Sequence, residues 1–419
     1  MQDNITEITT ESGARVFIAP TGAKDIVTIA GSVLGGPNHL PKEKSMVAYI
    51  TAELLDAGTR NKSKDELRML LAGKGTSLSF SSGGDRTYFQ GSCLPEDVSF
   101  LLSLITECLS ESRYDSKEIE LAKDRAYSDL IEEKTDTRIQ SAIAFSQSMY
   151  DETHVNYRNS TDKKSVSLKK IVRADIQKYA TFGQSGLVLS VVGDVDVRKS
   201  TKAVLSALKQ LQLKGHAVSP KTSNKKKATS GEVFISIADK TNIDVLIGAP
   251  LSITSSSPRY LAHTVLTSML GGRGIFSGHL TQTIRERDGL TYHISSSLSG
   301  MEVDTDGVLQ TYATFSPSTF AYAVKRTKQE IELFFTKEIT NTRLLNKQNQ
   351  MAGSYVVGLS TTSGLANTLH KIGVDGKPLS YLDEYPKLIR AVTLAELKDI
   401  AKTIPYKKFS VVASGTLPS

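Results

Sequence analysis

The segment from residue 281 to residue 292 carries side chains suited to chemistry on a polar substrate. Its sequence, TQTIRERDGLTY, places Arg285 on an expected helix and Tyr292 just beyond Gly289. Arginine is a permanently charged, forked donor, and a tyrosine hydroxyl can donate to a developing oxyanion. Gly289 is expected to end the helix in the left-handed conformation and to lead into a strand that carries Tyr292. Taken singly, Arg285 could equally be a surface residue and Tyr292 a core residue.

A glycine-rich turn, LGGRG, precedes this segment and contains Gly271, Gly272 and Gly274. A turn of this composition can bind phosphate through its backbone N–H groups. The sequence lacks the Gly-Lys-Ser/Thr ending of a P-loop and the spacing of a dinucleotide-binding motif. A phosphate site is therefore not expected here.

Residues that ligate metals are sparse. No two of the seven histidines lie three or four residues apart, the spacing that places two imidazoles on one helical face. The two cysteines, Cys93 and Cys108, form no CxxC motif, which excludes a disulfide framework and argues against a thiolate site. We therefore expect no metal site in this chain.

Composition limits the class of protein further. The chain has 419 residues, enough for two domains, and no apolar run approaches the roughly 20 residues of a membrane-spanning helix. The polar start, Met1–Thr10, predicts no signal peptide, so we expect a soluble protein of the cytoplasm, or of the periplasm if a signal has been removed. The net charge is only +7, and the basic run Lys225–Lys227 has no interleaved aromatic residues. Nucleic-acid binding is therefore not expected.

The elements that must position these residues occur in two similar halves. The polar segment 214–231 is predicted to link an N-terminal domain, residues 1–213, to a C-terminal domain, residues 232–419. In each half a proline-containing turn leads into a long helix, and a later helix precedes an apolar strand. The helices expected after the prolines are Glu96–Leu109 and Ser318–Phe335, and the strands are Leu187–Gly193 and Phe409–Ala413. This self-similarity predicts a duplicated domain.

The order of elements in the first half predicts its fold class. Alternating apolar residues indicate two strands, which are followed by two helices and a glycine-turned hairpin. The strands are expected at Arg15–Ile18 and Val27–Val33, the first helix ends near Gly58, the second is capped by Ser63 and Glu66, and the hairpin covers Ser77–Ser92. We expect an α+β fold in which each domain is a mostly antiparallel sheet covered on one face by helices.

This order of elements resembles the pitrilysin/insulinase family of metallopeptidases, which includes mitochondrial processing peptidase and the core proteins of the respiratory bc1 complex. Active members carry H-x-x-E-H on the first helix, with a carboxylate from a later helix as third zinc ligand. In the matching segment, Ala48–Thr59, Tyr49 and Glu53 stand at the two histidine positions and Ala52 at the general-base position. Asp129 is the best match to the third ligand. The resemblance implies a degenerate zinc box and half of a clam-shell of four related domains.

The second half retains a different part of the family pattern. The sequence IRERDGLTY is similar to the family's I-R-E-x-x-G-L-x-Y. The resemblance implies that Arg285 and Tyr292 hold the substrate backbone and help to stabilise the tetrahedral intermediate at a zinc site in a facing half. In processing-peptidase relatives the glycine-rich turn is associated with peptide binding, so Gly271, Gly272 and Gly274 are candidates for that role.

A chain with no zinc box and an intact Arg/Tyr pattern fits a division of labour. We expect a non-catalytic, substrate-binding subunit of a heterodimeric zinc metalloendopeptidase, inactive alone and binding no cofactor itself. A homologous zinc-bearing subunit would supply the metal, and peptides would be the substrate. Two alternatives stay open: a structural scaffold like the core proteins, or a peptide-binding protein without hydrolysis, alone or as a homodimer. The chain could also be one half of a longer fused protein.

Overall fold

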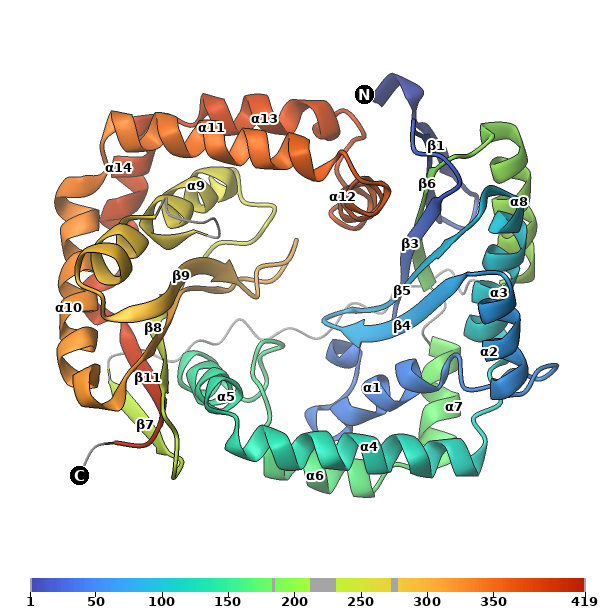
Figure 1. Cartoon of the computed structure of the whole chain (residues 1–419), viewed down its shortest axis with the longest axis horizontal. Helices are drawn as coiled ribbons and strands as arrows, with labels where there is room; N and C mark the ends of the chain where they lie inside the picture. Colours follow the sequence, from blue (N-terminus) through green and yellow to red (C-terminus); the bar gives the residue numbers. More distant parts are fainter. Residues whose placement is uncertain (1, 183–184, 212–230, 273–277, 418–419) are drawn as a thin grey trace. The chain divides into compact units, whose positions relative to one another are not determined.

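The computed structural model of the protein describes residues 2–182, 185–211, 231–272 and 278–417. These residues form two compact units, each built around one sheet (Figure 1). The first unit takes its described residues from 1–130, 161–221 and 356–384. The second takes them from 131–160, 222–355 and 385–419. The linker predicted at 214–231 lies outside the described residues except for Gly231.

The first unit contains a six-stranded sheet in the order β1-β2-β6-β3-β5-β4. Strands β2 and β6 are parallel, and the other neighbours are antiparallel. The strands are β1 (Thr6–Thr9), β2 (Arg15–Pro20), β3 (Val27–Leu34), β4 (Ser77–Gly83), β5 (Arg86–Cys93) and β6 (Ser185–Gly193). This arrangement confirms the mostly antiparallel sheet expected from the sequence.

Helices α3 (Val98–Glu111) and α8 (Val197–Gln210) cover one face of this sheet. Alternate residues of β2, β3 and β6 are apolar and buried against them, as a strand with one core-facing side requires. A second apolar cluster joins the helices α1 (Ser45–Leu54), α4 (Ser116–Thr135) and α7 (Arg173–Phe182). Helices α2 (Lys64–Gly73) and α6 (Thr161–Lys169) complete this part of the unit.

The opposite face of the first sheet receives one helix from the far end of the sequence, α12 (Thr362–Val374). It lies along β6 and β3 (Figure 1). The contact is close: a Cβ on Gly373 would lie 2.5 Å from Cγ1 of Val188 and 2.9 Å from Cε2 of Phe17. Thr28 and Ser32 of β3 make hydrogen bonds to Thr362 and His370 across the same contact.

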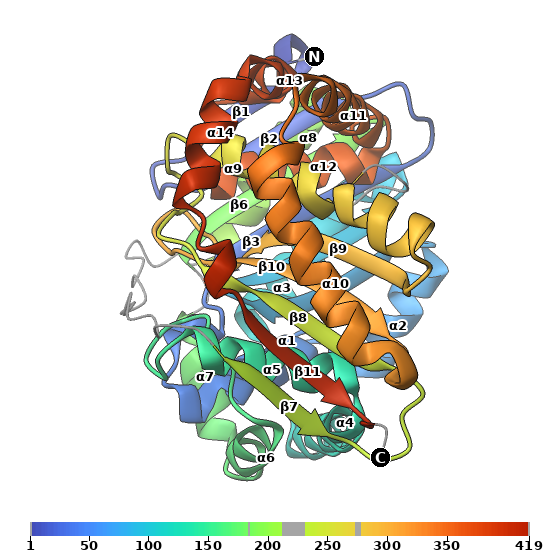
Figure 2. The ribbon, with the colours of Figure 1, turned by 90° about the vertical axis from the view of Figure 1, so that its left-hand side faces the viewer.

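The second unit repeats the plan with five strands in the order β7-β11-β8-β10-β9. Strands β7 and β11 are parallel, like β2 and β6, and the rest are antiparallel. Figure 2 looks onto the face of this sheet that the helices α9, α10 and α14 cover. The strands are β7 (Glu232–Ser236), β8 (Ile243–Pro250), β9 (Thr291–Ser299), β10 (Val308–Phe315) and β11 (Ser410–Gly415), and the helices are α9 (Tyr260–Gly271), α10 (Phe320–Leu333), α11 (Asn341–Gly358), α13 (Tyr381–Ala391) and α14 (Leu394–Thr403).

The second sheet also receives a helix from the other half of the sequence. Helix α5 (Thr137–Met149) lies on β8 and β11, where Phe145 and Met149 are buried against Leu246 and Val412. Helix α5, from the first half of the sequence, thus lies on the second sheet, and α12, from the second half, lies on the first sheet. The sequence analysis expected helices on one face of each sheet, and this exchanged helix lies on the opposite face.

Candidate functional site

The segment that matches the zinc box lies on helix α1, and its exposed face is poor in metal ligands. Met46, Ile50 and Leu54 recur every four residues and therefore lie on one face of α1. That face packs into the apolar core of the first unit. Tyr49 and Glu53, four residues apart, lie on the more exposed side, with Tyr49 46% exposed. Ala52, at the general-base position, is buried and has no group that can accept a proton.

Glu53 is paired with a cation supplied by helix α4. Nε of Arg125 donates to Oε1 of Glu53 over 2.6 Å, and both side chains are partly exposed. Asp129, the position matched to the third ligand, lies one turn further along α4 and is exposed. The residue that approaches the degenerate box from α4 is therefore Arg125, which the sequence analysis did not single out.

These residues do not fit zinc. A zinc site needs about four nitrogen, sulfur or oxygen ligands, and a catalytic one needs three from the protein. The box offers the single carboxylate of Glu53, which is already paired with a guanidinium. Among the described residues, no group of three or more His, Cys, Asp or Glu side chains is placed to hold a metal ion.

The second candidate site lies on a π-helical segment, η5 (Thr281–Arg287), and on the edge strand β9. The N–H of Asp288 bonds to the carbonyl of Thr283, and that of Leu290 to the carbonyl of Ile284. Gly289 between them has φ +63°, the left-handed conformation predicted for it. The chain then enters β9, as expected, with Tyr292 as its second residue.

Arg285 and Tyr292 meet across this turn. Cζ of Arg285 lies 5.0 Å from the centroid of the Tyr292 ring, within the range of a cation–π contact. Tyr292 is 85% exposed, which is unusual for so large an apolar ring. The structure thus brings together the two residues that the sequence pattern singled out, and it places them at the surface of the second unit.

A buried carboxylate holds the end of η5 in place. Glu330 of α10 is 1% exposed and accepts hydrogen bonds from Arg287 and Arg326. Asp288 is paired with the same two arginines, and His279 lies 2.7 Å from Glu330. Burial raises the pKa of Glu330, but the bonds from Arg287 and Arg326 outweigh it and hold that pKa below its usual value. The network fixes the segment that carries Arg285.

Helix α5 brings a second guanidinium toward this site. Cζ of Arg138 lies 4.9 Å from the ring centroid of Tyr312, which in turn lies 5.8 Å from the ring of His293. Partial burial, and then the charges of Arg138 and Arg285, hold the pKa of His293 below its usual value. The imidazole next to Tyr292 therefore stays neutral at neutral pH, between two permanent cations.

The glycine-rich turn takes part in packing where it is described. Gly271 ends α9 against β9, and a Cβ there would lie 2.7 Å from Oγ of Ser296. Gly272 caps the same helix. Gly274 lies outside the described residues. Gly271 thus lets α9 lie directly on the strand that carries Tyr292, whereas a Cβ on Gly272 would meet Ser268 of α9 itself.

The predicted hairpin Ser77–Ser92 is present as β4 and β5, and β4 is an edge strand. A cavity of about 250 Å³ lies between these strands and α12 in the first unit. It is lined mainly by polar groups, including Ser79, Ser81, Tyr88, Gln90, Asn367 and His370. His370 is buried, and its Nε2 lies 2.7 Å from Oγ of Ser32, within hydrogen-bonding distance. The same Oγ accepts a hydrogen bond from Nε of Arg86.

In the part of the chain that the structure describes, no helix has the length and apolar character needed to cross a membrane.

Comparison with known proteins finds a family match over part of the chain. Residues 171–351 match the family described as peptidase M16 inactive domain. These residues belong to the peptidase M16 inactive-domain family. The match confirms the resemblance to pitrilysin-type metallopeptidases and covers η5, Arg285 and Tyr292.

Solved structures share the fold of this chain over almost its whole length. A peptidase M16 inactive domain from Pseudomonas fluorescens is 18% identical, with a TM-score of 0.87 and 99% of each chain covered. A protease from Helicobacter pylori is 15% identical, with a TM-score of 0.86 and coverage of 98% and 99%. The chain also matches 46% of the periplasmic protease PqqL from Escherichia coli, at 16% identity and a TM-score of 0.79. These matches confirm the expected α+β fold.

A relative with a descriptive name is more similar in sequence. A Streptomyces coelicolor protein named as an uncharacterized zinc protease is 21% identical over 390 residues, which are 92% of this chain and 83% of that protein. The chain is thus similar to a protein named as a zinc protease, and its own box does not fit the zinc that this name implies.

Proposed function

We propose that this M16 chain is the non-catalytic, substrate-binding subunit of a heterodimeric zinc metalloendopeptidase. A homologous subunit with an intact zinc box would supply the metal and the general base. This chain would supply Arg285 and Tyr292 to the partner's site, where peptides are hydrolysed. The name of the Streptomyces coelicolor relative, a zinc protease, agrees with this reaction class.

The exposure of Tyr292 is the observation that carries the proposal. A tyrosine that is 85% exposed contributes little to the core, yet its strand is held by Gly289 and its ring by Arg285. The Glu330 network fixes the preceding helical segment. Ordered support for an exposed Arg/Tyr pair favours a role in binding over a role in stability.

The chemistry of the pair suits peptide hydrolysis in a partner's site. The guanidinium of Arg285 can donate to a peptide carbonyl, and the hydroxyl of Tyr292 can donate to the oxyanion that forms when water attacks that carbonyl. Neutral His293 beside them adds no further charge. The residues of this chain would bind and orient the peptide, while the attacking water would be activated elsewhere.

The test is reconstitution. The chain alone and the chain mixed with a zinc-box homologue from the same genome are assayed on a quenched fluorescent peptide, with metal analysis of both samples. We expect the chain alone to be metal-free and inactive, and the mixture to cleave the peptide in a chelator-sensitive way. A mixture no more active than the homologue alone would contradict the proposal.

A second candidate function is peptide binding without hydrolysis. The polar cavity beside edge strand β4 favours it, because an extended peptide can add to an open edge and place alternate side chains in such a cavity. Peptide affinity of the chain in the absence of any partner, together with an inactive mixture, would support this function instead. A purely structural scaffold would show neither affinity nor activity.

A further inference from the structure

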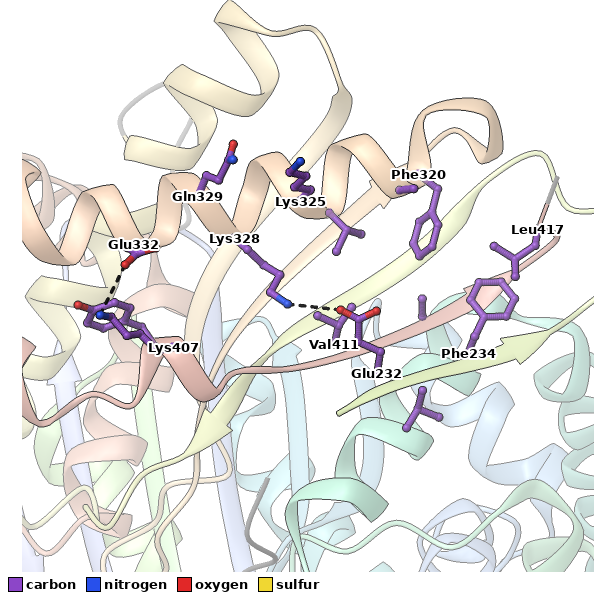
Figure 3. Close-up of a pocket in the computed structure, with 15 residues that line it drawn as sticks. Glu232, Phe234, Phe320, Lys325, Lys328, Gln329, Glu332, Lys407, Val411 and Leu417 are labelled. Atoms are coloured by element: carbon purple, nitrogen blue, oxygen red, sulfur yellow. Dashed lines mark hydrogen bonds and ion pairs between the residues drawn. The ribbon is translucent and has the colours of Figure 1, made fainter. Parts of the chain in front are cut away.

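The second unit has an open groove on its helical face, away from Arg285 and Tyr292. The groove has a volume of about 810 Å³ and runs along α10 above β7 and β11 (Figure 3). Val411 and Ala413 of β11 lie beneath it. Figure 2 shows β7 and β11 beside α10 with no helix drawn over them. Among the described residues, the groove is thus a gap in the helix layer of the sheet.

The first unit has a helix at the equivalent place. Strand β6 ends at Gly193 with φ +143°, and β11 ends at Gly415 with φ +156°. Each glycine carbonyl accepts a hydrogen bond of 2.8 Å from a backbone N–H, that of Thr21 in the first unit and that of Ile237 in the second. After Gly193 the chain forms α8, which lies on α3 and β2. Two residues after Gly415, Leu417 is 48% exposed in the groove. Its counterpart, Val195, lies against the core of the first unit.

Helix positions support the same equivalence. Helices α3 and α10 both begin three residues after a proline, Pro95 and Pro317, so their residues correspond in order. On α3, Thr106 donates to the carbonyl of Ala207 in α8. The residue of α10 that corresponds to Thr106 is Lys328, which lines the groove. The face of α10 that lines the groove therefore corresponds to the face of α3 that contacts α8 in the first unit.

The outer edge of the second sheet is open at the same corner. In the first unit β1 pairs with the outer edge of β2. The strand of the second unit that corresponds to β2 is β7. It pairs only with β11 among the described strands, and Val233 of β7 is 43% exposed. The strand pairing that closes this edge in the first unit thus has no counterpart among the described strands of the second.

The walls of the groove indicate the chemistry of an occupant. Phe234 and Phe320 meet edge to face at 5.9 Å and form an apolar end with Leu417 (Figure 3). Along the rest of the groove, Lys328 pairs with Glu232 at 3.3 Å, and Lys407 lies 3.8 Å from Glu332. Lys325 has no ion-pair partner among the described residues. Three lysines and two glutamates leave one positive charge in excess.

We propose that this groove binds an amphipathic helix of a partner protein, in the place that α8 occupies in the first unit. The bound face of that helix would carry small or branched apolar residues at helical spacing, as Val204 and Ala207 do in α8, and carboxylates opposite Lys325 and Lys328. The inference is independent of the role of Arg285 and Tyr292.

The probe is a fluorescein-labelled peptide with the sequence of residues 195–211. A second version carries Ser206→Glu and Gln210→Glu, which flank Ala207 on the helix and would face Lys325 and Lys328. Binding to the full chain is followed by fluorescence anisotropy. We expect the acidic peptide to bind more tightly than the native one, and its affinity to fall with added salt because the attraction is partly electrostatic.

Ala321→Trp is the blocking variant, since Ala321 is exposed, lines the groove and tolerates a larger side chain without disturbing the core. This variant should lower the affinity for the acidic peptide by about tenfold or more. Ala72→Trp, at an exposed position of α2 in the first unit, is the matched control and should leave affinity unchanged. Lys325→Glu with Lys328→Glu should reverse the preference between the two peptides.

Two results would overturn the proposal. One is failure of both peptides to bind up to about 1 mM, or equal binding to the native chain and Ala321→Trp. The other is a dimer in analytical ultracentrifugation that Ala321→Trp converts to a monomer, because a second copy of the chain would then be the occupant.

Discussion

The guanidinium of Arg125 lies 2.6 Å from the carboxylate of Glu53, at the position that aligns with a zinc-binding histidine. A permanent cation is thus already paired with the one acidic group of the box. Since a guanidinium and a metal ion would compete for the same carboxylate and repel each other, Arg125 should oppose any attempt to rebuild the metal site.

We predict that restoring the box by Tyr49→His, Ala52→Glu and Glu53→His gives weak zinc binding while Arg125 remains. Adding Arg125→Ala to the triple variant should strengthen zinc binding about tenfold or more, an effect typical of groups next to metal ligands. Competition with a chromogenic chelator measures the affinity. Arg113→Ala, which removes an exposed arginine in the same unit, is the control, and an equal gain from both changes would refute the role of Arg125.

The Arg285–Tyr292 pair gives a prediction for the reconstituted complex. Arg285→Ala and Tyr292→Phe should each lower kcat/KM by roughly 10²-fold, as for other donors to an oxyanion. Tyr292→Phe keeps the ring over Arg285 and removes only the hydroxyl, so it should leave thermal stability unchanged. Tyr322→Phe, at another exposed tyrosine, should have no effect on turnover. Unchanged turnover in both variants would remove the proposed role.

The buried carboxylate of Glu330 should matter for stability. Glu330→Gln keeps its size but removes the buried carboxylate and leaves Asp288 as the acidic partner of Arg287 and Arg326, which should lower the free energy of unfolding by about 1.5–3 kcal/mol. Glu332→Gln, at an exposed position two residues further along α10, should change it little. Because the pKa of Glu330 is lowered in the folded state, its contribution should be lost as the pH falls below 4.5. Urea unfolding at several pH values tests both statements.

His370 should also make the free energy of unfolding fall as the pH falls, but at higher pH values than Glu330. Burial, followed by the charges of Arg86 and Lys371, lowers its pKa from 6.5 to about 4, with Asp375 opposing. The unfolded chain then binds a proton that the folded chain does not, so stability falls as the pH falls from 6.5 toward 4.

For His370 alone the loss between pH 7 and pH 5 is about 2 kcal/mol. His370→Gln should therefore show a smaller drop in the free energy of unfolding over this interval than the native chain. Equal drops for the two proteins would show that His370 is not buried in its neutral form.

Gly373 and Gly353 should respond in opposite ways to alanine. Both lie in helices, where replacing glycine with alanine normally stabilises by about 0.5–1 kcal/mol. At Gly353 in α11 nothing lies within 4 Å of an added Cβ, so the usual gain is expected. At Gly373 in α12 the Cβ would meet Val188 and Phe17, and a loss of about 1–3 kcal/mol is expected. Stabilisation by both changes would mean that α12 does not contact the sheet this closely.

The sequence predicted those parts of the site that depend on local pattern. Gly289 marks the end of the helical segment, which follows from short-range geometry. The pair Arg285 and Tyr292 was predicted from the resemblance of IRERDGLTY to the family pattern, and the local turn brings the two side chains together. Arg125 could not be chosen over Asp129, since the two lie one turn apart on α4 and only the three-dimensional register decides which of them reaches Glu53. The partners of Glu330 likewise come from separate segments of the second unit.

The exchange of α5 and α12 could not be predicted from sequence for a different reason. Helical periodicity shows that a helix has an apolar face but does not say which sheet will cover it. The small residue Gly373 marks a close approach, yet its partners, Phe17 and Val188, are far away in the sequence. The strands themselves, which depend on alternation along the sequence, were the more predictable features.

The exchanged helix has a consequence for how the protein is made. Thr28 of β3 and its hydrogen-bond partner Thr362 of α12 are separated by 334 positions in the chain. At typical rates of synthesis, the ribosome needs roughly twenty seconds to a minute to cover that distance. During this time the first sheet has one face with no helix to cover it, including the buried hydroxyl of Ser32 and the ring of Phe17. The nascent chain therefore passes through an interval in which these residues lack the helix that covers them in the folded protein.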